Sequence, residues 1–158
     1  MNLVPASLEV RPIVASDADA LGRFHSLLSL ESTRLRYFSP HPRLSQQEVE
    51  HLTHVDHRDR EALVALIGDA IVGVARYERL GDTTEAEVAF VVADEWHRHG
   101  LGSMLLDRLA TRARSEGIER LVADTLCENH QMVNVFEQSG FPLTRTLDHG
   151  VVHVEMAI

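Results

Sequence analysis

The sequence predicts a single α/β domain in which about four helices cover a mixed sheet of about six to seven strands. Short apolar runs with strand-like alternation recur along the chain, and helical patterns lie among them. One strand–helix–strand unit occupies residues 85–126. A crossover of this kind is right-handed and places its two strands parallel, whereas strands joined by short turns pair antiparallel. Both connections occur here, so the sheet is expected to be mixed.

We expect residues 1–158 to form one domain. A chain of this length buries roughly 70% of the surface that it exposes when unfolded, and a hydrophobic fraction of 44% is ordinary for a globular protein. Charges interrupt every apolar run before it reaches the length of a membrane span. Residues 1–8 lack the basic start and the long apolar stretch of a secretory signal. These features predict a cytoplasmic protein with no membrane partner.

The first third of the chain is predicted to form a strand and two helices. Residues 8–13 alternate like a short strand, and Ser16 and Asp17 then precede an amphipathic pattern that ends near residue 28 and is typical of a capped helix. Two prolines break any pattern between residues 37 and 42. Ser45 and Glu48 form the capping box of a second helix, which reaches about residue 55.

A three-stranded antiparallel meander follows. Residues 62–67 and 71–74 are apolar and are separated by Gly68 and Asp69, which is the pattern of a β-hairpin. A second turn leads into residues 85–93, a run rich in Val, Ala and Phe.

The remaining sequence predicts two helices and three strands. Apolar residues at helical spacing predict helices over residues 101–117 and 129–139, and each of these segments is followed or closed by a glycine that favours a helix end. Strands are expected over residues 120–126, 143–147 and 151–157.

The charge balance is acidic. The chain has 15 Lys and Arg against 24 Asp and Glu, which gives a formal net charge of -9. Such a surface repels phosphate backbones and attracts cations. We therefore expect no nucleic-acid partner, and a protonated amine is a better candidate ligand. The same acidic balance also serves solubility alone.

The best candidate for a binding site is the turn before the long helix, residues 96–103. Gly100 and Gly102 bracket the helix start, where glycine lets a ligand approach the backbone closely. The first N–H groups of a helix lack intrahelical acceptors, and the helix dipole adds about +0.5 charge there. Together these features predict an anion site suited to a pyrophosphate. Leu105 replaces the third glycine of the dinucleotide-binding motif, and no Gly-Lys-Ser/Thr follows, so dinucleotides and nucleoside triphosphates are disfavoured.

Two motifs in this sequence resemble those of the GNAT superfamily of N-acetyltransferases. The turn His97-Arg98-His99-Gly100-Leu101-Gly102 resembles the Q/R-x-x-G-x-G/A signature, with His97 in place of Gln or Arg. A later segment matches the spacing of the N-x-x-A-x-x-x-Y-x-x-x-G-F helix through Asn129, Met132, Phe136, Gly140 and Phe141. The order of the predicted elements agrees with the superfamily along essentially the whole chain.

The resemblance implies a GNAT-like sheet with a splayed parallel pair of strands and acetyl-coenzyme A (acetyl-CoA) as the co-substrate. The backbone of Phe90, Val91 and Val92 would hold the acetyl group and the pantetheine arm, and the side chain of Asn129 would contact that arm. The pyrophosphate would be held by Arg98, His99, Gly100, Leu101, Gly102 and Ser103. The side chains of Arg98 and His99 would either add positive charge there or be solvated. The acceptor would bind around the two N-terminal helices and residues 37–45.

Acetyl transfer to an amine needs a base, because an amine with a pKa of about 10.4 is neutral in roughly one molecule in 2,500 at pH 7. Glu87 is the predicted general base, since the strand Glu87-Val88-Ala89-Phe90 is similar to the strand that carries this base in lysine-acetylating members. Glu85 is its same-face neighbour and either substitutes for it or is a solvated edge charge. Phe136 stands where many members have a tyrosine, so the leaving thiolate departs unaided or takes its proton from another group.

The resemblance thus predicts an N-acetyltransferase. The acceptor amine is expected to be a protein lysine, because residues 86–96 are most similar to domains that modify lysines of acyl-CoA synthetases, and a small cationic amine is the second candidate. The alternative function is a non-catalytic acyl-CoA-binding module that regulates a partner. The protein is expected to be a monomer or a homodimer.

No metal is expected. His51, His54 and His57 are spaced by three, but no acidic or cysteine ligand completes a site, so they are expected to be solvated. Cys127 is the only cysteine and is expected to be a small buried residue.

Overall fold

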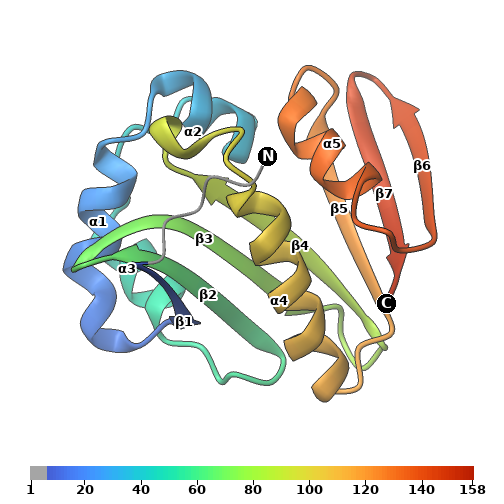
Figure 1. Cartoon of the computed structure of the whole chain (residues 1–158), viewed down its shortest axis with the longest axis horizontal. Coiled ribbons are helices and arrows are strands. Elements are labelled where there is room, and N and C mark those ends of the chain that lie inside the picture. Colours follow the sequence, from blue (N-terminus) through green and yellow to red (C-terminus); the bar gives the residue numbers. More distant parts are fainter. Residues whose placement is uncertain (1–6) are drawn as a thin grey trace.

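A seven-stranded sheet forms the centre of the part of the chain that the structure, a computed structural model, describes, residues 7–158 (Figure 1). Its strand order is β1-β2-β3-β4-β5-β7-β6, and all neighbours are antiparallel except the parallel pair β4 and β5. The predicted α/β class with a mixed sheet is confirmed. The strands are β1 (Leu8–Pro12), β2 (Arg60–Ile67), β3 (Ala70–Arg79), β4 (Glu85–Val92), β5 (Arg120–Leu126), β6 (Leu143–Asp148) and β7 (Val151–Ala157).

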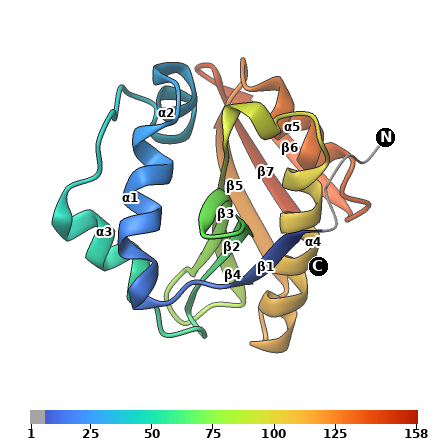
Figure 2. The same ribbon diagram turned by 60° about the vertical axis from the view of Figure 1, so that its left-hand side comes forward.

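Five α-helices are found in residues 7–158, where about four were expected. They are α1 (Ala18–Ser26), α2 (Leu30–Tyr37), α3 (Gln46–Thr53), α4 (Leu101–Ser115) and α5 (His130–Glu137). Helices α1, α2 and α3 lie on one side of the sheet, and α4 crosses the other side (Figure 2). No helix within residues 7–158 is long and apolar enough to span a bilayer. The predicted lack of a secretory signal concerns mainly residues 1–6, which lie outside the described part of the chain.

Helix α2 was not predicted. It begins after Ser29, whose side chain accepts the backbone N–H of Ser32 at 3.0 Å, and it ends at Phe38 in a left-handed conformation. Its sequence is polar around most of the helix, so the apolar stripe that identifies an amphipathic helix is missing. Tertiary contacts with β4 and β5 hold this helix in place.

The predicted cap of the first helix differs in detail. Helix α1 follows a short 3₁₀ turn, and Asp17 makes no side-chain cap to it. Instead, the buried Asp17 carboxylate accepts the Val14 backbone N–H at 2.8 Å and two hydrogen bonds from the Arg11 guanidinium. These bonds hold the pKa of Asp17 below its usual range, with the Arg11 contact as the largest cause. The predicted capping box of Ser45 and Glu48 is present at α3.

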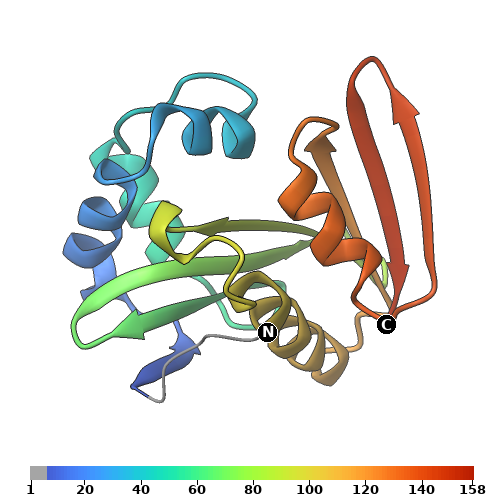
Figure 3. The same cartoon turned by 45° about the horizontal axis from the view of Figure 1, so that its top comes forward.

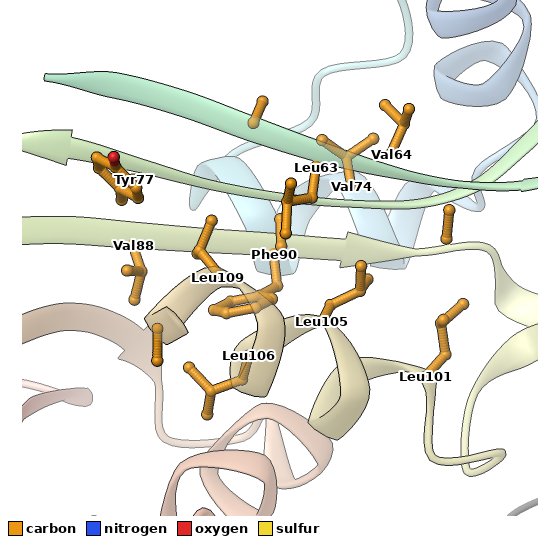
Figure 4. Close-up of a cluster of buried hydrophobic side chains, with 14 of the residues drawn as sticks. Leu63, Val64, Val74, Tyr77, Val88, Phe90, Leu101, Leu105, Leu106 and Leu109 are labelled. Carbon is orange, nitrogen blue, oxygen red and sulfur yellow. The ribbon is translucent and has the colours of Figure 1, made fainter. Parts of the chain in front are cut away.

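Helix α4 is fixed against the sheet by a row of leucines that face β3 and β4 (Figure 4). Leu101, Leu105 and Leu109 are each at most 1% exposed, and such burial contributes roughly 1.5–3 kcal/mol per side chain. The approach is close, because a Cβ added to Gly73 would lie 3.2 Å from both Leu101 and Leu105. This packing fixes the start of α4 beside the end of β4.

The parallel strands β4 and β5 separate along their length. Their pairing runs only from Glu85 opposite Arg120 to Glu87 opposite Val122. Strand β4 then continues alongside β3 to Val92, while β5 stays paired with β7. Figure 3 shows the two strands diverging, with α2 and α5 near the opening. The splayed parallel pair is therefore confirmed.

Cys127 is exposed, so the prediction that it is buried is wrong. Strand β5 ends one residue earlier, at Leu126, and the Cys127 backbone N–H bonds the carbonyl of Gly150. The chain turns outward here to begin α5.

Candidate active site

A cavity of about 800 Å³ opens where β4 and β5 separate. Its volume lies within the range of roughly 300–1,000 Å³ that is usual for small-molecule sites. The predicted site residues on β4, in the turn before α4 and at the start of α5 line this cavity, with one exception, His99. They are Glu87, Phe90, Val91, Val92, Arg98, Gly100, Leu101, Gly102, Ser103 and Asn129.

His99 does not line the cavity. Its ring packs edge-to-face on Trp96, with 5.6 Å between ring centroids. Its Nδ1 atom is buried and makes no hydrogen bond within the described chain. His99 is thus the one predicted site residue that the structure places outside the wall of the cavity.

The start of α4 has the properties of an anion site. Gly100 is the N-cap residue, with φ of 83°, a left-handed conformation that glycine adopts without strain. Within this helix, which is fully described, no side chain caps the N-terminus and no acidic residue lies in the first turn. The first N–H groups are therefore free to bind a ligand, and the helix dipole favours an anion there. These residues fit the pyrophosphate of coenzyme A.

Gly102 also has a packing role. A Cβ at this position would lie 3.2 Å from Cγ2 of Val135, on α5. Helices α4 and α5 thus approach each other through this glycine, and both line the cavity. A side chain at residue 102 would disturb the helix contact as well as the anion site.

His97 has a structural role that the family signature does not give. Its Nε2 atom lies 2.9 Å from the carbonyl oxygen of Val92, which requires Nε2 to carry the proton. This hydrogen bond ties the turn to the end of β4. Arg98, the next residue, has a φ of 65° and is exposed at the edge of the cavity.

One edge of β4 is open beyond Glu87. From Val88 to Val92 the strand pairs with β3 on one side, and β5 does not pair with it on the other. Unpaired strand edges present backbone N–H and C=O groups to an extended ligand. The open edge of residues 88–92 lies along the cavity and fits an extended, amide-bearing arm such as pantetheine.

The inner end of the cavity is apolar. Phe90 and Phe136 pack edge-to-face with ring centroids 6.0 Å apart, and both are buried. Asn129 caps α5, since its side-chain oxygen accepts the Met132 backbone N–H at 3.3 Å. The amide NH₂ group of Asn129 takes no part in this cap and can donate hydrogen bonds to a ligand.

A second cavity, of about 520 Å³, lies on the side of the sheet that carries α2 and α3. The two cavities share Arg36, Glu87, Val88 and Ala89 in their walls. Glu87 is exposed and lies where they meet, so it can reach ligands in both. Sequence reasoning did not find Arg36 or Arg76, which also lines the second cavity.

The three histidines spaced by three make separate contacts. His51 Nε2 lies 3.0 Å from the Arg60 guanidinium, and His54 Nδ1 lies 2.8 Å from a carbonyl of its own helix. His57 Nδ1 contacts the buried carboxylate of Glu61 at 2.7 Å. Within the described residues no group of three or more His, Cys, Asp or Glu is arranged to hold a metal ion.

Comparison with known proteins agrees with this geometry. The sequence model of the acetyltransferase (GNAT) family matches residues 24–141. Acetyltransferase Pat of Mycolicibacterium smegmatis is 30% identical over 94% of this chain, and the match spans 45% of that protein's length.

Solved structures give the same result. The GNAT domain of S. lividans PAT superposes with a TM-score of 0.90 at 39% identity, covering 96% of this chain and 90% of that domain. The fold also matches yncA of Salmonella typhimurium, solved with acetyl-CoA, at a TM-score of 0.78 and 17% identity, with 96% and 94% covered. The chain therefore belongs to the GNAT family of acetyltransferases.

Proposed function

We propose that this protein transfers an acetyl group from acetyl-CoA to an amine, with Glu87 as the general base. The observation that carries the proposal is the position of Glu87, at the meeting point of two cavities. The larger cavity includes the start of α4 and the open edge of β4. The smaller cavity, unlike the larger one, is lined in part by α3. The first would take the co-substrate and the second the acceptor.

Different residues of this chain would bind the co-substrate and accept the proton. Acetyl-CoA, when bound, supplies the acetyl group as a reactive thioester. The start of α4 would hold the pyrophosphate, and the edge of β4 from Val88 to Val92 would align the pantetheine arm. The Glu87 carboxylate would accept the proton that an ammonium group must lose before it can act as a nucleophile.

Phe136 has no proton to give to the leaving thiolate. Free thiols have a pKa of about 8.5, so a thiolate is a modest base and can leave without a general acid. We propose that no acid from position 136 is needed for turnover.

For the acceptor, we propose a protein lysine. The proposal is supported by the likeness of residues 86–96 to lysine-acetylating domains and by the match to the S. lividans domain. The match spans less than half of the mycobacterial relative, so the activity of that whole protein is not transferred to this chain. A cytoplasmic location and a monomeric or homodimeric state stay predictions.

The test is an assay of coenzyme A release with acetyl-CoA and a panel of lysine peptides and small amines. Acceptor-dependent thiol release, with the acetylated product seen by mass spectrometry, would support the proposal. Binding of acetyl-CoA without turnover of any amine would instead support the alternative, a regulatory acyl-CoA-binding module.

A further inference from the structure

Two arginines line the proposed acceptor cavity from different elements. Arg36 belongs to α2, and Arg76 belongs to β3, where it pairs opposite Ala89. Ala89 is two residues from Glu87 on the same face of β4. The two arginines therefore lie near the predicted base and on its side of the sheet.

Neither arginine forms a salt bridge within residues 7–158, where the ion pairs with a distance of at most 4.0 Å involve other residues. Arg76 makes one long contact, 3.4 Å, to the carbonyl of Leu52. Arg79, which lines the same cavity, does have a carboxylate partner, because it contacts Asp59 at 2.8 Å.

This arrangement is costly without a counter-charge. Burial, together with the nearby charge of Arg36, lowers the pKa of Arg76 to about 10. Burial also lowers the pKa of Arg36, while the Glu87 charge acts in the opposite direction. Charges removed from water are normally paired, and an anionic ligand would supply the missing partner.

We propose that Arg36 and Arg76 bind a carboxylate of the acceptor and thereby direct its amine to Glu87. The guanidinium fork matches the two oxygens of a carboxylate, and such pairs fix orientation as well as charge. The inference rests on the proposed acetyl transfer and names its acceptor class, an amine with a nearby carboxylate. The carboxylate is supplied either by the acceptor amino acid itself or by an Asp or Glu side chain beside an acceptor lysine. A polyamine lacks this group and adds positive charge beside two guanidinium groups.

The experiment compares matched acceptors that differ only in the carboxylate. One arm uses peptides with Glu or Gln next to a single lysine, and the other uses free lysine and lysine amide; spermidine is the cationic reference. In at least one arm, kcat/KM for the carboxylate member should exceed that of its neutral partner by about 10- to 100-fold, as for a hydrogen bond to a charged group. The arm with the larger ratio identifies the source of the carboxylate.

Variants assign the effect to the two arginines. Arg76→Gln and Arg36→Gln should each reduce the ratio between the matched acceptors toward one, chiefly by lowering kcat/KM of the carboxylate member. Arg76→Lys keeps the charge and loses the fork, so it should keep part of the ratio. Arg108→Gln, an exposed change on α4 outside both cavities, should leave the ratio unchanged. Stabilisation by acetyl-CoA verifies that each variant is folded.

Failure of this inference is distinct from failure of the proposed function. Equal kcat/KM for both members of each pair, or an unchanged ratio in both Gln variants, would overturn the role of the arginines and leave acetyl transfer in place. If no amine is turned over, calorimetric titration of the same matched pairs decides the inference. Tighter binding of the carboxylate member, lost in Arg76→Gln, supports it, and equal binding overturns it.

Discussion

Glu87 combines a backbone fixed by strand pairing with an exposed side chain. It is the last residue of β4 that pairs with β5, and its side chain is exposed at the junction of two cavities. Strand pairing fixes its backbone, and the separation of the strands opens space beside its carboxylate. A general base needs both a fixed position and access to the substrate proton.

Glu87→Gln should therefore lower turnover at neutral pH by about 10²- to 10⁴-fold, because the amide has nearly the same shape and accepts no proton. Affinity for acetyl-CoA should change little. Raising the pH should restore much of the rate, since more of the acceptor is already neutral. The measurement is the pH profile of kcat for the variant and the wild type.

Glu85→Gln is the matched control. Glu85 lies two residues earlier on the same face and accepts a hydrogen bond from Arg120 at 3.1 Å. Its loss should leave kcat near the wild-type value. Wild-type turnover of Glu87→Gln from pH 6 to 9 would remove Glu87 from the mechanism, whereas loss of both binding and turnover would assign it a structural role.

The pKa of His153 is a second property of a single residue that can be measured. Its Nδ1 lies 2.7 Å from the carboxylate of Asp124, which lines the larger cavity, and Glu155 lies 3.6 Å from its Nε2. These contacts raise the pKa of His153 above its usual value, with the Asp124 hydrogen bond as the largest cause. NMR titration of the histidine ring should show this raised pKa.

Asp124→Asn should return the pKa of His153 toward 6.5. Because the folded-state pKa is raised, the stabilisation from this pair is fully present below the unfolded-state pKa and is lost as the pH rises through the folded-state pKa. A pKa of His153 that does not change in Asp124→Asn would contradict the assigned cause.

The residues of the proposed cofactor site were predictable, and the two arginines of the proposed acceptor cavity were not. Gly100 and Gly102 act through local chemistry, a helix start that follows a strand, and a sequence pattern records such chemistry directly. Arg36 and Arg76 are 40 positions apart and come to the same cavity only because α2 packs against β4, the strand that pairs with β3. The available signal was Arg76 itself, a charge inside the apolar strand Ala70–Arg79.

At the scale of helices and strands, the contact between α4 and α5 controls the shape of the larger cavity. It depends on Gly102, because an added Cβ there would press on Val135. Gly102→Ala should lose about 1–3 kcal/mol of stability to this contact, as at other overpacked sites, against a gain of up to about 1 kcal/mol in helix propensity, and it should weaken acetyl-CoA binding. Urea unfolding and calorimetric titration measure the two effects.

Val135→Ala in the Gly102→Ala background separates packing from ligand contact. Removing two methyl groups makes room for the new Cβ, so the double variant should be more stable than the sum of the single changes predicts. Strict additivity of the unfolding free energies would contradict the proposed contact. Recovery of stability without recovery of affinity would assign the loss of binding to the anion site itself.

Most elements were predictable because their patterns are local. The strands of the meander, α4 and the closing hairpin follow from apolar spacing and turn residues. Helix α2 is different, since its residues form no apolar stripe, and its only local marks are the Ser29 cap and the Glu31–Arg34 ion pair of 2.6 Å. Its position is fixed by packing beside the opening between β4 and β5, which local patterns do not reveal.

A ligand in the larger cavity would contact β4, the turn, α4 and α5 at once, so its binding should stabilise the whole domain. Acetyl-CoA at about one hundred times its dissociation constant should stabilise the native state by about 2.7 kcal/mol. For a domain of this size the melting temperature should rise by roughly 5 to 10 °C. Differential scanning calorimetry with millimolar acetyl-CoA makes the measurement, and an unchanged melting temperature would count against the cofactor site.

A crystal structure with bound coenzyme A shows which of the two cavities takes the co-substrate. We expect the pyrophosphate to contact the backbone of residues 100–103. The pantetheine arm should lie along the open edge of residues 88–92, with the thiol toward Glu87. Coenzyme A bound in the other cavity, with its phosphates on Arg36 and Arg76, would overturn the proposed roles of both cavities.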